Sequence, residues 1–574
     1  MQRRSGLNDA RSGRVSRWIR GRAPLAVWIV LWLLALAALA RGVGTTPLMD
    51  PDEGRNAEVA REMAQRGDFV VPHLNGLPYL DKPILFFALA ALSIRGLGAT
   101  ELAVRLPALL STYASVALVV AFGLQIFGRR KAALAGLVLA TSPLVVGFAR
   151  VVIFDSTLML CASASLFAFY RAWERDGAGW WVAGWAAAGL GVLTKGPIGV
   201  ALPLLVNLAY AWSCGERARR ILHPLGLLVF ALVVAPWFFA VAARHPEFPH
   251  YAFVRETFER TTTNRMNRTG PPYYFLPLLL GGALPWALVP LSALPAWMRI
   301  WRERRGAGRA HAYLLLWIAV PLLFFSLSQS KRPGYILPVF PAVALLCAHA
   351  SLEWPAARRR AAWMAATLAL LGALVVALGM GTISSRIAVP ELAAALRAAA
   401  PVVCAIFLAA ALASAAALRL GSPLALIAGM ALVPASIALS ANGVLSVMGN
   451  YRSERALAET IRAAVPHEIR VVGVGVYPAS LAYYLAAEIP VASARGREFK
   501  SNYIAEYESV LRERPDSPLR PVDWWREQLR SCSTPTVFVI KKNSQDRADL
   551  EARLTLLAEG PHYAAFGPCG EDAP

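Results

Sequence analysis

The stretch DPDEGRNAEVAREMAQRGDFVVPHLNGLPYLDKP, residues Asp50 to Pro83, is the most densely charged part of an otherwise apolar chain. It follows one hydrophobic segment, Pro24 to Ala40, and precedes a dozen more, which places it at a membrane surface. Seven carboxylates are interleaved there with arginines and a lysine. Acidic and basic side chains mixed so closely beside lipid indicate a functional site.

Composition indicates a polytopic membrane protein. Of the 574 residues, 57% are hydrophobic and 16% are charged, and the mean hydropathy is +0.47. The formal net charge is +22, a value that also occurs in proteins that bind nucleic acid. The net charge is therefore explained either by basic loops beside membrane spans or by a nucleic-acid-binding surface, and the positions of the basic residues distinguish the two.

Thirteen hydrophobic segments are long enough to cross about 30 Å of hydrocarbon. The first follows an arginine-rich N-terminus and is interpreted as a retained span, because no small-residue cleavage site closes it cleanly. The others lie at 101–127, 132–149, 156–172, 178–194, 197–213, 221–242, 273–295, 311–328, 334–352, 361–380, 395–418 and 423–446.

Basic residues recur in alternate loops between these segments. If the N-terminus is cytoplasmic, the inner loops are residues 128–131, 171–177, 215–220, 299–309, 358–360 and the turn at Arg419, and every one is basic. The positive-inside rule therefore explains the net charge, and no nucleic-acid partner is expected. An odd number of spans places the first loop and the C-terminal tail on the outer side.

Two domains follow from this pattern. We expect a transmembrane domain over residues 1–448, with an outer-face loop at 41–100, and a small α/β domain over 449–574. In the tail, Ile469–Val476 and Thr534–Lys542 read as buried strands and Ser480–Glu488 as a helix. Its two cysteines, Cys532 and Cys569, either pair in an oxidising periplasm or remain free thiols.

The segment Asp50-Pro51-Asp52-Glu53 has two interpretations. Asp50 can cap a helix that begins at Pro51, with the next two acids stabilised by the helix dipole and Glu53 completing a capping box. Alternatively, Asp52 or Glu53 faces a polar cavity, where a carboxylate accepts a proton or binds a substrate. The spacing alone leaves both open.

Two of the seven lysines precede a proline that opens a helix, in Lys82-Pro83 and Lys195-Gly196-Pro197. A helix N-terminus repels a cation, but a bound phosphate would remove the conflict because backbone N–H groups and the ammonium would both face an anion. The alternative is that each lysine extends to the membrane interface.

Further charges lie on the outer side of the predicted spans. Asp155 either caps the helix that follows it or belongs to the site. Outer cations cluster in the loop 253–274, which contains Arg260, and in SQSKRPGYILP (328–338), which contains Tyr335. Their clustering favours an anionic ligand, although anionic lipid headgroups would draw the same residues.

The ordered set of the acidic pair Asp52-Glu53, RNAEVAREM, GDFVVP, YLDKP, Asp155 and KRPGYILP resembles the polyprenyl-phosphate-dependent glycosyltransferases of the GT-C fold. Within them it is most similar to the lipid A 4-amino-4-deoxy-L-arabinose transferases, relatives of the protein O-mannosyltransferases. The resemblance covers the transmembrane part. The tail carries no motif that matches.

The resemblance implies transfer of a sugar from a polyprenyl-phosphate donor, at the outer face of the bacterial inner membrane, to a lipid or glycan acceptor such as lipid A. Carried over by motif, Asp52 and Asp155 are the acids beside the reacting sugar, and the donor phosphate is surrounded by Arg55, Tyr79, Lys82, Arg260 and Tyr335. The family usually has Glu-Lys-Pro where this chain has Asp81-Lys82-Pro83. That departure puts a divalent metal ion at Asp81 in doubt, and no other cofactor is expected.

The residues fit this chemistry independently of the family. Loss of a polyprenyl phosphate builds negative charge on the leaving oxygen, which the cations Lys82 and Arg55 would stabilise. A hydroxyl acceptor would need Asp52 as general base, whereas an acceptor phosphate is already anionic. A single displacement predicts inversion at the anomeric carbon.

Three other functions compete with this interpretation. A polyprenyl-phosphate hexosyltransferase acting on another glycan or on protein hydroxyls has the same features. A lipid transporter or flippase usually shows repeated halves, and none is evident. A structural envelope protein would not need outer lysines beside acidic pairs. An enzyme is favoured.

Overall fold

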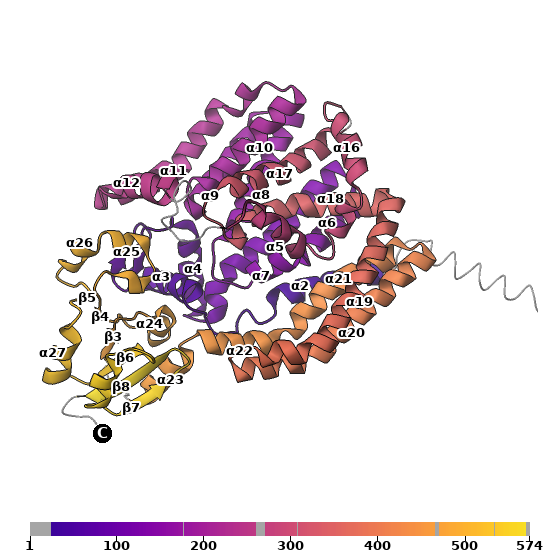
Figure 1. Cartoon of the computed structure of the whole chain (residues 1–574). Coiled ribbons are helices and arrows are strands. Elements are labelled where there is room, and N and C mark those ends of the chain that lie inside the picture. Colours follow the sequence, from indigo (N-terminus) through magenta and orange to yellow (C-terminus); the bar gives the residue numbers. More distant parts are fainter. Residues whose placement is uncertain are drawn as a thin grey trace, which may run out of the picture.

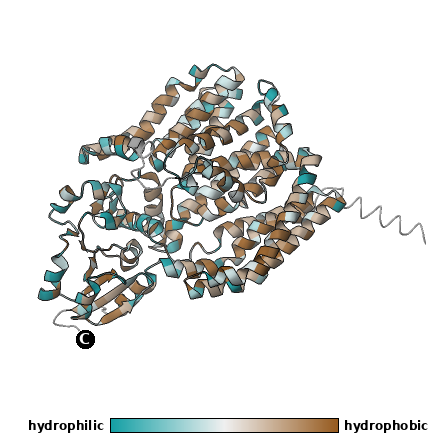
Figure 2. Ribbon diagram, viewed as in Figure 1, coloured by the Kyte–Doolittle hydropathy of each residue, from teal (hydrophilic) through white to brown (hydrophobic). Residues whose placement is uncertain are grey.

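The computed structural model describes residues 25–175, 177–259, 270–306, 308–464, 470–532 and 534–569. Helices form a large body, and a small sheet domain lies at one end of it, beside α3 and α4 (Figure 1). Apolar residues cover most of the long helices, and polar residues concentrate at helix ends and in the sheet domain (Figure 2). The arginine-rich N-terminus, residues 1–22, lies outside the described residues.

Seven of the described helical segments are long and apolar enough to cross a membrane. They are α5 (Glu101–Ile126), α11 (Pro224–Arg244), α17 (Arg309–Leu327), the continuous pair η4 (Pro333–Val339) and α18 (Phe340–Glu353), α19 (Pro355–Ser385), α20 (Pro390–Leu420) and α21 (Pro423–Ser440). Shorter apolar helices are α2 (Leu25–Ala40), α4 (Leu85–Leu97) and α10 (Ile198–Cys214). Two further helices, α8 (Asp155–Glu174) and α9 (Ala178–Lys195), pack against each other.

Two predicted spans are interrupted. The segment 132–149 divides at Ser142 into α6 (Arg129–Ala140) and α7 (Pro143–Phe148). The segment 273–295 forms η3 (Pro272–Tyr274), α14 (Phe275–Gly282), α15 (Leu288–Leu291) and α16 (Leu294–Arg302). Proline lacks an N–H and clashes with the preceding turn, so Pro143 and Pro285 account for these breaks. The count of thirteen spans is therefore not confirmed and stays a prediction.

The first outer loop forms a helix, a short hairpin and the start of α4. The helix α3 (Asp52–Arg66) packs against α4 and against α24 (Ala479–Leu485) of the C-terminal part. The hairpin pairs β1 (His73–Leu74) with β2 (Leu77–Pro78). A side chain at Gly54 would stand 2.6 Å from the backbone nitrogen of Ser480, so only glycine lets α3 and α24 approach this closely.

The C-terminal part contains a six-stranded sheet in the order β5-β4-β3-β6-β8-β7. The neighbours β5, β4, β3 and β6 are parallel to one another, and β8 pairs antiparallel with both β6 and β7. They are β3 (Arg470–Val474), β4 (Val491–Ala492), β5 (Leu519–Arg520), β6 (Thr536–Lys541), β7 (Leu556–Glu559) and β8 (Tyr563–Cys569). The two predicted strands are β3 and β6, and the predicted helix is α24.

Short elements connect these parts. They are η1 (Ala218–Ile221), α12 (Phe248–His250), η2 (Tyr251–Glu259), α22 (Asn442–Arg452), α23 (Arg455–Ala464), η5 (Arg497–Phe499), α25 (Asn502–Glu506), α26 (Glu508–Arg512), α27 (Trp524–Ser531) and α28 (Arg547–Glu551). A disulfide joins Cys532 to Cys569, which confirms the paired alternative for these cysteines.

Candidate active site

A polar cavity of about 230 Å³ lies where the first outer loop, the helical body and the C-terminal domain meet. Segments distant in the sequence converge on it: α3, the turn before α4, the start of α8, the end of α9, the loop before η4 and the segment around Lys500. Its charged lining residues are Asp52, Arg55, Asp81, Lys82, Asp155, Lys195, Glu256, Arg332 and Lys500. Opposite charges are therefore concentrated in one small space.

The neighbouring acids Asp52 and Glu53 differ in their surroundings. Asp52 lines the cavity with 39% of its side chain exposed, and its Oδ1 accepts a hydrogen bond from Arg55 at 2.6 Å. Glu53 is buried outside the cavity lining and pairs with Arg105, with Nε to Oε1 at 2.9 Å and Nη2 to Oε2 at 3.0 Å. The structure thus brings Asp52, and not Glu53, to the other predicted site residues.

The predicted cap by Asp50 is wrong. Pro51 is the residue that precedes α3, and no side chain caps it. The Asp50 carboxylate instead accepts hydrogen bonds from the Ser480 backbone N–H at 3.0 Å and from the Ser480 hydroxyl at 2.5 Å. Glu53 does reach back, accepting a bond from the Met49 N–H at 3.2 Å. Asp50 therefore links the outer loop to the C-terminal domain.

Lys82 lies three residues before α4, and its ammonium contacts Glu256 of η2 at 2.5 Å. The two residues are 174 positions apart in the sequence. Both side chains are mostly buried, with exposed fractions of 16% and 12%. The paired lysine is directed into the cavity rather than toward a lipid interface.

Asp81 holds three segments together. Its Oδ1 accepts bonds from the Tyr251 hydroxyl and from the Tyr503 N–H at 2.9 Å, and its Oδ2 accepts one from the Asn502 N–H at 3.0 Å. Among the described residues, no group of three or more His, Cys, Asp or Glu side chains is arranged to hold a metal ion. Both oxygens of Asp81 are engaged by protein donors, and a divalent metal ion at this position stays a prediction.

Asp155 begins α8 and pairs with Lys195, with Nζ to Oδ1 at 2.5 Å. Lys195 is the last residue of α9, where a cation interacts favourably with the helix dipole, and it also precedes Pro197 at the start of α10, as expected. Its ammonium also lies 5.0 Å from the ring centre of Tyr335. A side chain at Gly334 would stand 2.3 Å from the Asp155 carboxylate, so glycine is required there.

Arg55 joins the cavity to the C-terminal domain. Its Nη1 donates to the Lys500 carbonyl at 2.8 Å, and its guanidinium lies 5.9 Å from the ring centre of the buried Tyr79. Arg332 adds another cation, 3.6 Å from the second oxygen of Asp52. An anion entering the cavity would meet cations on several sides.

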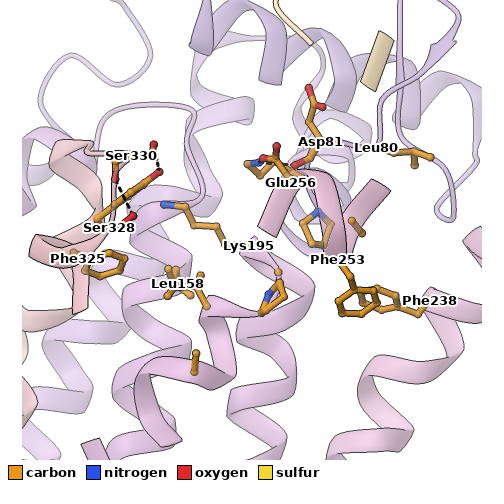
Figure 3. A pocket seen from close by; sticks show the side chains of 18 of the residues that line it. Leu80, Asp81, Leu158, Lys195, Phe238, Phe253, Glu256, Phe325, Ser328 and Ser330 are labelled. Carbon is orange, nitrogen blue, oxygen red and sulfur yellow. Dashed lines mark hydrogen bonds and ion pairs between the residues drawn. The ribbon is translucent and has the colours of Figure 1, made fainter. Parts of the chain in front are cut away.

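An apolar cavity of about 210 Å³ adjoins the polar one. The two share the lining residues Asp81, Lys82, Lys195, Glu256 and Tyr335. Figure 3 shows Asp81, Lys195 and Glu256 on one side of the apolar cavity, with the rings of Phe238, Phe253 and Phe325 and the side chain of Leu158 below them. The combined space has a charged end and a hydrocarbon-lined end.

Burial perturbs two carboxyls beneath the site, outside the spans. It raises the pKa of Asp50 to about 6, although the hydrogen bonds from Ser480 lower it. It raises the pKa of Glu454 to about 8, and the charge of Asp50 raises that pKa further. These two groups therefore titrate near neutral pH.

The structure places seven predicted site residues around one cavity: Asp52, Arg55, Tyr79, Asp81, Lys82, Asp155 and Tyr335. Arg260 lies outside the described residues. Lys195, Glu256, Arg332 and Lys500 also line the cavity but were not assigned to the site from the sequence. Lys195 precedes a proline that opens a helix, and Arg332 and Glu256 lie in the segments 328–338 and 253–274 noted for their cations, whereas Lys500 has no local signal.

Comparisons with known proteins agree with this geometry. Residues 81–239 match the family model described as dolichyl-phosphate-mannose-protein mannosyltransferase. The undecaprenyl phosphate-α-4-amino-4-deoxy-L-arabinose arabinosyl transferase of Aeromonas salmonicida is 38% identical over 315 residues, 54% of this chain and 56% of that protein. The transferase of the same name from Pectobacterium carotovorum is 36% identical over 386 residues, 65% of this chain and 67% of that protein. The matches thus span about half to two thirds of these relatives.

Solved structures match over nearly the whole chain. The crystal structure of ArnT from Cupriavidus metallidurans bound to undecaprenyl phosphate has a TM-score of 0.82 and 27% identity, covering 96% of this chain and 100% of that one. The archaeal oligosaccharyltransferase AglB from Archaeoglobus fulgidus, at 12% identity and a TM-score of 0.50, covers 90% of this chain and 69% of that one and shares the fold alone. The GT-C fold with a small C-terminal α/β domain, and the multi-pass membrane character, are confirmed. The chain belongs to the family of undecaprenyl phosphate-α-4-amino-4-deoxy-L-arabinose arabinosyl transferases.

Proposed function

We propose that this protein is a membrane glycosyltransferase that moves 4-amino-4-deoxy-L-arabinose from a polyprenyl-phosphate donor to a lipid acceptor such as lipid A. The observation that supports this most is the joining of the polar and apolar cavities through five shared residues. A polyprenyl-phosphate sugar is itself charged at one end and apolar along its chain. Its chain fits the phenylalanine-lined cavity and its phosphate fits the cations at the boundary.

The boundary residues supply the electrostatics of the reaction. Cleavage of the bond between the anomeric carbon and the phosphate oxygen leaves charge on that oxygen. Lys82 and Lys195 line both cavities, and Arg55 lines the polar one, so their positive charges stabilise the leaving phosphate. Their carboxylate partners Glu256, Asp155 and Asp52 hold these cations in position.

Asp52 is placed for the acceptor side of the reaction. It is exposed to the polar cavity, whereas Asp155 is 3% exposed and engaged by Lys195. With a hydroxyl acceptor, Asp52 takes the proton as general base; with an acceptor phosphate, the nucleophile is already anionic and needs no strong base. In both cases a single displacement inverts the anomeric centre, and a product with retained configuration would refute this mechanism.

The proposed location is the outer face of a bacterial inner membrane, with the N-terminus in the cytoplasm and the C-terminal domain in the periplasm. Basic loops on the opposite side support this orientation. Accessibility of single cysteines introduced at exposed Lys541 and Arg130 to a membrane-impermeant thiol reagent tests it. Labelling of Arg130→Cys but not Lys541→Cys in intact spheroplasts would reverse the topology.

Mass spectrometry of lipid A from cells with and without the gene tests the reaction. We expect a pentosamine-sized addition to disappear in the deletion strain and in the Asp52→Asn and Lys82→Ala variants. Unchanged lipid A would exclude this acceptor. The match of residues 81–239 to the mannosyltransferase family model makes another glycan or a protein hydroxyl the second candidate acceptor, in which case a polyprenyl-linked sugar would accumulate in the deletion strain.

A further inference from the structure

The sheet of the C-terminal domain contains a crevice of the kind that binds ligands in open α/β folds. From β3 the chain proceeds to β4 and β5 on one side and then crosses to β6 on the other side of β3. The strand order therefore reverses between β3 and β6. In open parallel sheets, ligands bind outside the carboxyl ends of the strands at such a switch point.

A cavity of about 300 Å³ lies at that position. Its lining includes Gly475 and Val476, which follow β3, and Lys541, the last residue of β6. The rings of Tyr477 and Phe499 stack with their centres 4.5 Å apart and form part of the wall. The cavity is large enough for a small polar ligand with one apolar face.

Three exposed cations, Arg497, Lys500 and Lys541, line this cavity. Within the described part of the chain none of the three forms an ion pair, whereas five other cations of the domain do: Arg455, Arg512, Arg526, Lys542 and Arg547. The acids in the lining are engaged: Asp50 by Ser480, and Glu498 by the Ser493 hydroxyl at 2.5 Å. The crevice therefore contains three cations that form no ion pair with either of its carboxylates.

The crevice adjoins the candidate active site. Arg55 and Lys500 line both the crevice and the polar cavity, and the Arg55 guanidinium donates to the Lys500 carbonyl at 2.8 Å. A ligand held in the crevice thus lies one side chain away from Asp52. The C-terminal domain therefore contributes lining residues to both cavities.

We propose that this crevice binds a phosphate group of a phosphorylated sugar, and that this sugar is the hydrophilic part of the acceptor. The second half of this statement rests on the proposed function. Unpaired lysine and arginine side chains favour phosphate, and the stacked aromatic wall favours a sugar face. The site would hold the acceptor at a point remote from the reacting atom, so that binding there positions the acceptor for transfer.

Isothermal titration of the full-length protein in detergent with glucose 1-phosphate tests the site without turnover. We expect the double variant Arg497→Ala/Lys541→Ala to bind glucose 1-phosphate at least about tenfold more weakly than wild type, because each charge-assisted hydrogen bond contributes appreciably. Glucose, which has no phosphate, should bind neither protein. Lys542→Ala is the matched control, because Lys542 is the next residue and pairs with Glu559 outside the crevice.

Dispersed lipid A, a phosphosugar that carries acyl chains, distinguishes the source of the phosphate. Charge-dependent binding of lipid A without binding of glucose 1-phosphate would support a site specific for the lipid acceptor, and binding of both would support a general phosphosugar site. Binding of neither, or equal binding by wild type and the double variant, would overturn the proposal. Titration requires no transfer, so a failure of the proposed reaction and a failure of this site give separate results.

Discussion

The cations of the polar cavity and those of the crevice beside it differ in their partners. In the polar cavity, Arg55, Lys82 and Lys195 each contact a carboxylate at 2.5 to 2.6 Å. Arg55 also lines the crevice, but the other crevice cations, Arg497, Lys541 and the shared Lys500, form no ion pair among the described residues. A cation that must stabilise a transition state is fixed before the substrate arrives, whereas a cation that only binds an anion can remain in solvent. The cations that pair with a carboxylate are therefore those proposed to act in the reaction, and the unpaired cations are those proposed only to bind an anion.

The buried ion pair Arg105–Glu53 lines neither cavity and has a purely structural role. Breaking it should have the largest effect of the changes considered, a loss of free energy of unfolding. Arg105 also donates to the carbonyls of Val43, Thr46 and Pro47, so it fixes the chain that leads to α3. Arg105→Met leaves the Glu53 charge buried without a partner, which typically costs about 3 to 5 kcal/mol. Thermal unfolding of the purified protein should show this loss, and adding Glu53→Gln to Arg105→Met should recover part of it. Unaltered stability of the single variant would contradict the structural role.

The paired cavity residues predict the next largest effect, on activity rather than on stability. Asp155→Asn removes the charge that holds Lys195, and we expect sugar transfer to fall about 10²- to 10³-fold, as when one preorganised group is lost from an active site. The unfolding temperature should fall less than in Arg105→Met, because Lys195 is partly exposed whereas Arg105 is fully buried. Lys131→Ala is the control, because Lys131 pairs with Glu353 away from both cavities. Equal activity of Asp155→Asn and wild type would remove Asp155 from the site.

Gly334→Ala tests whether the position of the paired carboxylate matters. The added carbon would stand 2.3 Å from Asp155 Oδ1 and must displace it. This displacement should lower kcat by about tenfold or more. The decrease should be smaller than that expected for Asp155→Asn, which removes the charge. Gly96→Ala is the matched control, because no atom of the described residues lies within 4 Å of a side chain added there. If both variants are equally active, the Asp155 position is not critical.

The pH dependence of stability gives the smallest predicted effect. Burial raises the pKa of Glu454 to about 8, so its protonated form stabilises the fold at low pH and this contribution is lost as the pH rises from about 4.5 through 8. Glu454→Gln cannot ionise and should lose less stability. Between pH 6 and pH 9 we expect the unfolding temperature of wild type to fall by about 2 °C more than that of the variant. Glu459→Gln, at an exposed position of α23, should behave as wild type.

Most of the fold class followed from local sequence. Runs of apolar residues predict helices at membrane depth wherever they occur, so the order of the apolar segments and the change to strands in the tail could be predicted. The interruptions of the segments 132–149 and 273–295 could not be predicted, because a proline does not always break a helix. Pro107 lies inside the continuous helix α5, whereas Pro143 and Pro285 lie at breaks. Neighbouring helices decide which outcome a proline has.

The sequence by itself determined which residues could form the site: outer-loop acids, lysines before prolines, and late cations with Tyr335. Only the tertiary structure decided how they are used. Successive residues of a helix point about 100° apart, so Asp52 faces the cavity while Glu53 faces Arg105. Lys82 forms an ion pair with Glu256, which is 174 residues away in the sequence. The crevice forms where β3 and β6, which are distant in the sequence, pair in the sheet. Such pairings depend on packing between distant segments, which no local pattern specifies.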